Sequence, residues 1–123
     1  MLAGGEEGAT MIAAQQVAEK ASLMIVRSPE DASSQGQQIV LTQFPFMIGR
    51  VEGSLLIKDA NLSRRHAQIT YEASNRSYFI TDLNSSNGTQ LNEQRLTPGQ
   101  PAQLTRGAVI GLGPNVTLRF DLS

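Results

Sequence analysis

The chain has 123 residues, with 10 basic and 11 acidic side chains, one histidine and no cysteine. This length fits one domain with a real hydrophobic core, and the absence of cysteine excludes disulfides and thiolate metal sites. A net charge of −1 argues against a nucleic-acid binder that works by covering phosphates. No apolar run approaches the ~18 residues of a membrane span. The acidic start "MLAGGEEGAT" makes a poor signal peptide, so we expect a cytoplasmic protein without membrane insertion.

Residues 1–21 differ in composition from the rest and are interpreted as an N-terminal extension or linker. The stretch "MLAGGEEG" is glycine-rich and acidic, which is typical of disordered segments. Residues 10–21 predict a short helix, which Thr10 caps and whose apolar face runs from Met11 to Ala21. A lone helix of this length is marginal in water, so we expect the extension to be flexible or briefly helical.

From residue 22 onward the hydrophobic pattern has a period of two, which indicates β-strands. Short segments rich in β-branched and aromatic residues alternate with turn signals such as "EASNRS", "NSSNG" and "TPGQP", with no helix between them. The predicted strands are 22–28, 37–43, 46–50, 54–57, 67–73, 77–83, 89–92, 102–105, 108–113 and 116–122. This spacing predicts an all-β sandwich or barrel that forms one domain over residues 22–123. Sandwiches hold their loops at two ends, and binding residues are commonly found on such loops.

Three fragments concentrate arginine, hydroxyl and amide side chains in or beside predicted loops. They are "IGR" at 48–50, "LSRRH" at 62–66 and "DLNSSNGTQLN" at 82–92. In this order and spacing, on a background of strands, they resemble the forkhead-associated (FHA) domain, a phosphothreonine-binding module. The resemblance extends from Leu23 to Leu122. It implies an FHA-type β-sandwich of about eleven strands, which agrees with the strand pattern.

The chemistry of phosphothreonine explains why such residues belong together. The group carries about −1.5 to −2 charges and three acceptor oxygens, so a pocket for it needs fixed donors. Arginine suits this need because its planar guanidinium can donate to two phosphate oxygens at once, and hydroxyl and backbone N–H groups add further hydrogen bonds. Arg50 at a strand end, Ser63 with the two arginines after it, and Ser86 with Asn87 would together form one anion site.

The resemblance implies a role for each of these residues. Arg50 and Arg64 match arginines that contact phosphate, Ser63 and Ser86 match phosphate-contacting hydroxyls, and Asn87 matches the asparagine that hydrogen-bonds the peptide main chain. The expected phosphopeptide-binding set is Arg50, Ser63, Arg64, Arg65, Ser86 and Asn87. The residues expected to shape the loops without contacting ligand are Gly49, His66, Gly88 and the framework residue Asn92.

Some of these residues also have a purely local interpretation. In an extended segment, Arg64 and Arg65 would point to opposite faces, and the family register favours Arg64 at the phosphate with Arg65 on the rim or in solvent. Ser63 can cap a turn through its hydroxyl. The pair Asn87-Gly88 is a tight-turn dipeptide, and in the family it is both a turn and a ligand contact.

Two positions depart from the family pattern. Glu93 stands where a glycine often follows the framework asparagine, and Gly107-Ala108 stands where a Gly-Asp pair is common. Both lie outside the binding loops. They bring two turn shapes into question and leave the pocket unaffected.

Other functions fit the sequence less well. Ser63, His66 and Asp82 are the only Ser/His/Asp set worth naming, and no nucleophile-elbow sequence surrounds the serine; Asp82 and Ser85 are interpreted as structural. One histidine without cysteine makes a catalytic zinc improbable, so we expect no catalytic residue, cofactor or metal. Nucleic-acid binding is disfavoured because the three loops offer no aromatic side chain for base stacking.

The sequence therefore predicts a phosphothreonine-dependent adaptor module, which implies a Ser/Thr kinase in the same cell and a phosphothreonine-containing partner protein. A phosphate-independent interaction scaffold on the same fold is the alternative. Selectivity around the phosphothreonine is expected to come from residues 59–61 and from the loop 50–54.

Overall fold

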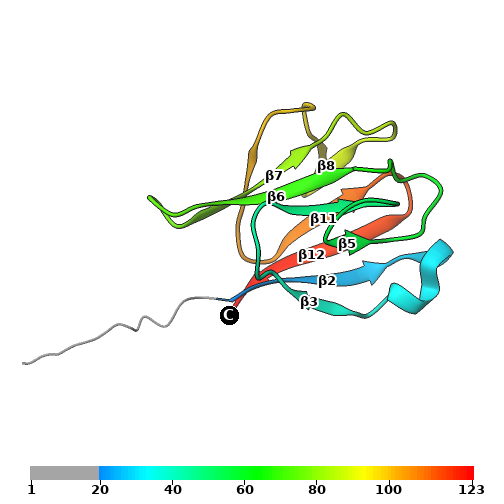
Figure 1. Ribbon diagram of the computed structural model, residues 1–123, viewed down its shortest axis with the longest axis horizontal. Helices are drawn as coiled ribbons and strands as arrows, with labels where there is room; N and C mark the ends of the chain where they lie inside the picture. The colour runs from blue at the N-terminus through cyan, green and yellow to red at the C-terminus, as the bar shows by residue number, and fades with distance from the viewer. Residues whose placement is uncertain (1–19) are drawn as a thin grey trace, which may run out of the picture.

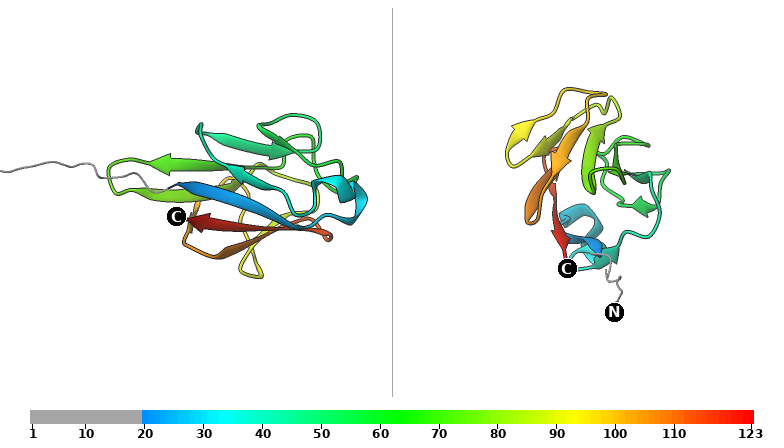
Figure 2. Two further views of the ribbon diagram at one scale, coloured as in Figure 1. Left: turned by 90° about the horizontal axis from the view of Figure 1, so that it is seen from below. Right: turned by 90° about the vertical axis from the view of Figure 1, so that its left-hand side faces the viewer.

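The computed structural model describes residues 20–123, which form two β-sheets packed face to face (Figures 1 and 2). One sheet has five strands in the order β10-β7-β6-β4-β5, and the other has six in the order β3-β2-β12-β11-β8-β9. The strands are β2 (Ala21–Arg27), β3 (Gln38–Val40), β4 (Phe46–Gly49), β5 (Leu55–Leu56), β6 (Ala67–Glu72), β7 (Ser77–Asp82), β8 (Thr89–Leu91), β9 (Gln94–Arg95), β10 (Ala102–Leu104), β11 (Ala108–Leu112) and β12 (Val116–Leu122). The predicted β-sandwich of about eleven strands is confirmed.

Each of the ten predicted segments overlaps a strand, and two elements differ from the expectation. The strand β9 was missed because its two residues are both polar and exposed, so they give no alternating hydrophobic signal. The segment between β2 and β3, interpreted as a turn, holds the 3-10 helix η1 (Pro29–Ser34). Its proline lies at the start and two acidic residues lie in the first turn, as is typical of helix starts.

The described chain begins at Lys20, near the end of the helix expected over residues 10–21. Most of that helix lies outside the described residues. Its last residue, Ala21, is the first residue of β2 and is paired with Leu122 of β12. Lys20 and Ser123 exchange backbone hydrogen bonds of 3.2 and 3.0 Å, so the two ends of the described chain lie side by side. No helix in the described residues is long and apolar enough to cross a membrane.

The core lies between the two sheets, where alternate residues of each strand point inward. Ile110 and Leu112 of β11 and Leu118 and Phe120 of β12 are fully buried, and the residues between them are more exposed. Burial of each such side chain stabilises the folded state by about 1.5–3 kcal/mol. Four aromatic rings (Phe44, Tyr71, Tyr78 and Phe120) stack at one end with centroid separations of 4.7 to 5.9 Å. This apolar interior makes the sandwich a rigid support for its loops.

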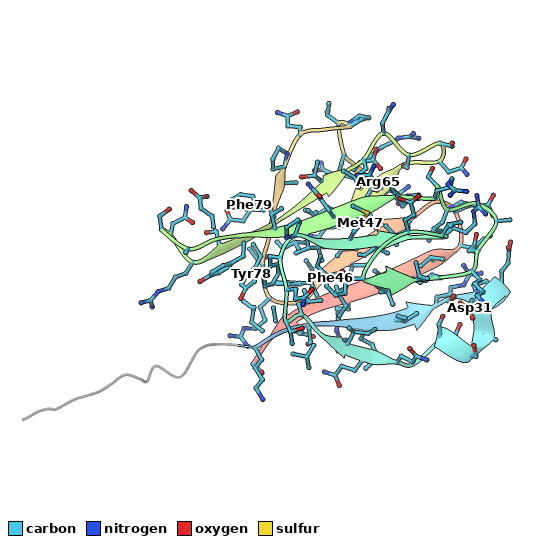
Figure 3. All side chains as sticks on the ribbon, viewed as in Figure 1. Asp31, Phe46, Met47, Arg65, Tyr78 and Phe79 are labelled. Carbon is cyan, nitrogen blue, oxygen red and sulfur yellow. The ribbon has the colours of Figure 1, made fainter. Side chains whose placement is uncertain are left out.

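Strand register brings three loops together at one end of the sandwich. Ala67 at the start of β6 is paired with Ile48 near the end of β4 and with Asp82 at the end of β7. The loops that follow β4 and β7 therefore meet the loop that precedes β6. In Figure 1 these loops lie on the right, and the β6–β7 hairpin and the C-terminus lie on the left. Figure 3 likewise shows Arg65 and Asp31 toward the loop end, with Tyr78 and Phe79 toward the other end.

Candidate functional site

One depression opens at the loop end of the sandwich, between the β4–β5, β5–β6, β7–β8 and β9–β10 connections. It is lined by Arg50, Ala60, Asn61, Leu62, Ser63, Arg64, Arg65, Asp82, Leu83, Asn84, Ser86, Asn87, Pro98 and Gly99. All six residues predicted to bind a phosphopeptide belong to this lining. They come from three separate loops, which are the first loop (β4–β5), the second loop (β5–β6) and the third loop (β7–β8). The four residues predicted to shape the loops are not among the lining residues.

Arg50 follows β4 and is fixed through its backbone and its side chain. Its N–H donates to the carbonyl oxygen of Ser63 at 3.0 Å, and its Nε donates to the carbonyl oxygen of Leu62 at 3.0 Å. Within the described residues, the bond from Nε is the one hydrogen bond of this guanidinium. Nη1 and Nη2 can therefore donate their hydrogens to a ligand. A bound anion would meet an arginine whose orientation is already set.

Gly49 allows the close approach of the two loops beside Arg50. A Cβ atom at this position would lie 2.1 Å from the carbonyl oxygen of Arg64 and 2.5 Å from that of Glu52. Both contacts are to backbone, which cannot move without breaking the bonds that the Arg64 carbonyl accepts from the N–H groups of Val51 and Glu52, at 3.3 and 3.0 Å. The loop-shaping role predicted for Gly49 therefore has a steric reason, because any side chain at this position would collide with the backbone.

Ser63 and Ser86 lie next to one another across two loops. The backbone N–H of Ser86 donates to Oγ of Ser63 at 2.9 Å. Because this bond uses a lone pair of the Ser63 oxygen, the hydroxyl hydrogen remains available to donate. Ser63 is half-buried and Ser86 is exposed, so both hydroxyls border the depression.

His66 is fully buried and connects the loops that carry Ser63 and Ser86. Its Nδ1 accepts a 3.1 Å hydrogen bond from the backbone N–H of Ser63, and its Nε2 lies 2.9 Å from the carbonyl oxygen of Gly88. The neutral imidazole with its hydrogen on Nε2 satisfies both contacts. Burial lowers the pKa of His66 below its ordinary 6.5, and the Gly88 carbonyl and the Asp82 carboxylate act in the opposite direction. The neutral form is therefore the one that holds the loops.

Asp82 organises the third loop from within. It is 1% exposed, and its Oδ1 accepts hydrogen bonds of 2.6 Å from both Ser85 Oγ and Thr89 Oγ1. Oγ of Ser85 in turn accepts a 2.9 Å bond from the N–H of Gly88. Asp82 and Ser85 are thus structural, as predicted. The histidine ring accepts from the Ser63 backbone rather than from its hydroxyl, and the carboxylate binds other groups, so this geometry is not that of a Ser/His/Asp triad.

Gly88 and Asn87 complete the third loop. Gly88 adopts φ +87°, and a Cβ there would meet the guanidinium of Arg95 at 2.7 Å. Its carbonyl oxygen accepts from Gly113 N–H at 3.0 Å as well as from His66. Asn87 Nδ2 donates to the carbonyl oxygen of Asn61 at 2.8 Å. The Asn87 amide oxygen and the second Nδ2 hydrogen are therefore able to form hydrogen bonds with a peptide main chain.

Arg64 and Arg65 do not diverge as an extended segment would require. The chain bends at both residues, and both line the depression. Nη2 of Arg64 lies 3.4 Å from Oε2 of Glu52, and Nε of Arg65 lies 4.0 Å from Oε1 of the same carboxylate. The premise of an extended backbone therefore does not hold at these two residues, and the placement of Arg64 at the phosphate with Arg65 on the rim stays a prediction.

Asn92 lies away from the depression, in the turn between β8 and β9. It exchanges hydrogen bonds with Val109 of β11: its N–H donates to the Val109 carbonyl at 2.8 Å, and its Oδ1 accepts from the Val109 N–H at 2.9 Å. Asn92 and Glu93 both have positive φ, of 50° and 72°. Asn92 therefore fixes the turn against the sheet, and Glu93 takes a backbone conformation that glycine adopts more readily.

Several contributors to the site carried no recognisable sequence signal. Pro98-Gly99 belongs to a stretch interpreted only as a turn, yet Gly99 N–H donates to the Asp82 carbonyl at 2.9 Å. The helix η1 supports the second loop from outside. Oδ2 of Asp31 accepts from the N–H of Lys58, and Oε1 of Glu30 accepts from the N–H of Ala60, each at 2.9 Å. By contrast, Glu52 and Asn61 lie in the segments 50–54 and 59–61, from which selectivity was expected to come.

The depression offers donors and positive charge rather than metal ligands. Across residues 20–123, no group of three or more His, Cys, Asp or Glu side chains is arranged to hold a metal ion. The lining combines three guanidinium groups, two serine hydroxyls and three asparagine amides, a donor set that suits an oxyanion.

Comparison with known proteins places this geometry in context. The family model of the FHA domain matches residues 46–113. The FHA domain-containing protein FhaB of Mycobacterium tuberculosis is 29% identical over 107 residues, which cover 81% of this chain and 66% of FhaB. The solution structure of the FHA domain of an Arabidopsis thaliana hypothetical protein has a TM-score of 0.73 at 29% identity and covers 85% of this chain and 86% of that one.

A further solved structure, of Mycobacterium tuberculosis EmbR in complex with a low affinity phosphopeptide, is also similar. Its TM-score is 0.69 at 28% identity, over 85% of this chain and 24% of EmbR. The chain spans only 36% to 66% of the length of the first curated relatives that it matches.

Proposed function

Because the chain belongs to the FHA domain family, we propose that it is an adaptor module that binds phosphothreonine-containing proteins. The observation that carries the proposal is the convergence of Arg50, Ser63 and Ser86 on one depression with donors unused by the protein itself. The solved complex of EmbR, a similar chain, with a phosphopeptide supports it. FHA domains are interaction modules, so the proposal contains no catalytic step.

The geometry suggests how the phosphate would be held. Nη1 and Nη2 of Arg50 and the guanidinium of Arg64 would neutralise the charge, and the Ser63 and Ser86 hydroxyls would donate to its oxygens. Arg50 and Ser63 are already held by contacts to the neighbouring loops, so these two side chains lose little conformational freedom on binding. Asn87, bridged to Asn61, would bind the peptide main chain next to the phosphothreonine.

An adaptor of this kind would act in Ser/Thr kinase signalling. We extend the proposal to a cytoplasmic Ser/Thr kinase that modifies the partner protein. The modification itself would switch binding on, because a threonine hydroxyl offers neither the charge nor the acceptor oxygens that the depression fits.

One calorimetric experiment tests the proposal. A single peptide is titrated as its threonine, phosphothreonine and phosphoserine forms, and a single-stranded oligonucleotide is titrated beside it. We expect measurable binding of the phosphopeptides only, with phosphothreonine preferred because its extra methyl group adds about 0.8 kcal/mol if buried. Equal binding of the unmodified peptide would favour the phosphate-independent scaffold, and binding of the oligonucleotide alone would favour a nucleic-acid function.

A further inference from the structure

An acidic residue at the rim of the depression, Glu52, forms ion pairs with two of the arginines that line the depression. We propose that Glu52 is an internal counter-anion of the pocket, which a phosphopeptide must displace and which selects against acidic residues beside the phosphothreonine. The inference rests on the proposed function and names a determinant of affinity and specificity within it.

The backbone of Glu52 is held in place on two sides. Its N–H donates to the Arg64 carbonyl oxygen at 3.0 Å, and its own carbonyl oxygen lies against Gly49, 2.5 Å from the position that a Cβ atom there would take. The side chain therefore cannot leave the rim, although its end can turn. A glutamate fixed at this point keeps its charge within reach of the pocket in the free and in the bound protein.

The two carboxylate oxygens of Glu52 face two different arginines. Oε2 lies 3.4 Å from Nη2 of Arg64, and Oε1 lies 4.0 Å from Nε of Arg65. These side chains are 52%, 63% and 60% exposed in the order Glu52, Arg64, Arg65. Exposed ion pairs of this kind stabilise a fold little, so the arrangement opens readily when a stronger anion arrives.

Other acidic side chains near the depression are engaged elsewhere. The Asp82 carboxylate is buried and accepts from Ser85 and Thr89, and Oδ1 of the buried Asp59 accepts from the N–H of Asn61. Glu30 and Asp31 accept from backbone N–H groups of the second loop. Among the acidic residues of the described chain, Glu52 is the one seen to pair with arginines of the lining.

Binding of a phosphate dianion then becomes an exchange of anions. The phosphate takes the arginine donors, and the displaced carboxylate remains close to it, well within the screening length of about 8–10 Å. The resulting repulsion lowers affinity and slows association, because charges at a rim act mainly on the encounter. An acidic peptide residue next to the phosphothreonine meets the same repulsion, whereas a lysine there can pair with the released Glu52.

The test compares wild type, Glu52→Gln and a matched control, Glu72→Gln. Glu72 ends β6 at the hairpin on the opposite side of the molecule, and its carboxylate accepts from Ser74. Its substitution removes the same charge without touching the pocket. Each protein is titrated by calorimetry and stopped flow with three phosphothreonine peptides that carry Lys, Gln or Glu at the flanking positions, at low and high salt.

We expect wild type to prefer the peptides in the order Lys, Gln, Glu. Glu52→Gln should bind the Gln-flanked peptide on the order of threefold more tightly at low salt, with most of the gain in the association rate, and the gain should shrink at high salt. It should also bind the Glu-flanked peptide at least as well as the Lys-flanked one. Glu72→Gln should behave as wild type.

Phosphate-dependent binding in which Glu52→Gln keeps the affinity and the order of wild type would overturn this inference alone. A lower affinity of Glu52→Gln would also overturn it, because that result assigns Glu52 a supporting role. Wild type that fails to distinguish phosphorylated from unmodified peptide would instead overturn the proposed function, and this inference with it. Glu52→Ala serves as a second variant, for which the same gain in affinity is expected.

Discussion

The backbone N–H of Ser86 donates a 2.9 Å hydrogen bond to the side-chain oxygen of Ser63, which lies 23 positions earlier in the chain. This bond joins the second and third loops beside the depression. It also orients the Ser63 hydroxyl, because an oxygen that accepts from Ser86 is left with its own hydrogen to donate. One contact thus links the local loop structure to the chemistry proposed for the pocket.

Replacing Ser63 by alanine removes both functions of its hydroxyl. We expect Ser63→Ala to weaken phosphopeptide binding by about 1.5–3 kcal/mol, the range for a hydrogen bond to a charged group. The melting temperature should change little, because the Ser86 N–H is exposed and water can replace the lost acceptor. Calorimetry on this variant is compared with Ser74→Ala, an exposed serine of the distant hairpin. Affinities that agree within twofold between the two variants would remove Ser63 from the site.

His66 makes stability depend on pH in a defined direction. Because burial holds its pKa below the ordinary 6.5, the unfolded chain binds a proton more readily than the folded one below that pH. The stabilising contribution of the neutral ring is therefore complete above about pH 6.5 and is lost as the pH falls below it. Protonation of Nδ1 would also break the bond from the Ser63 N–H.

The measurement is the free energy of unfolding by urea between pH 7.5 and 5, for wild type and His66→Gln. We expect the variant to be less stable at pH 7.5 by about 1–3 kcal/mol, since it disrupts a buried hydrogen-bonded network. The difference between the two proteins should narrow below pH 6.5. Parallel curves across the whole range would show that His66 does not titrate in this way.

Glu93 offers a stabilising substitution away from the site. It has φ +72° in the β8–β9 turn and follows Asn92 at φ +50°, the arrangement in which Asn-Gly is preferred. Glu93→Gly should raise the free energy of unfolding by about 0.5–1 kcal/mol, because relief of the left-handed strain exceeds the extra entropy of glycine in the unfolded chain. Urea unfolding measures this, and phosphopeptide affinity is the control that should not change. A less stable variant would mean that the Glu93 side chain contributes contacts that outweigh the strain.

The fold was predictable because its strands alternate strongly. The sequence signal failed at β9, where both residues are exposed, and at η1, whose proline and acidic residues were interpreted as a turn. Local patterns of two or three residues do not determine such short elements. Their positions depend on the neighbours to which they bond.

Motif spacing predicted part of the lining of the depression and little of its geometry. The six residues predicted to bind a phosphopeptide all line the depression, and motif spacing predicted His66 to shape the loops. It could not show that the ring accepts from Ser63 and contacts Gly88, since these bonds join separate loops. The pairing of Glu52 with both Arg64 and Arg65 was missed for the same reason, and the bend at the two arginines invalidated the argument from an extended chain.

The most direct test of phosphate-dependent recognition is calorimetry of one phosphothreonine peptide with wild type, Arg50→Ala and Arg50→Lys. Arg50 donates through Nε to the Leu62 carbonyl and keeps two NH₂ groups for the ligand, so its truncation should weaken binding by about 2–5 kcal/mol while the fold remains intact by circular dichroism. Arg50→Lys keeps the charge but loses the planar fork and should fall between the other two. Binding by Arg50→Ala within threefold of wild type would contradict the account.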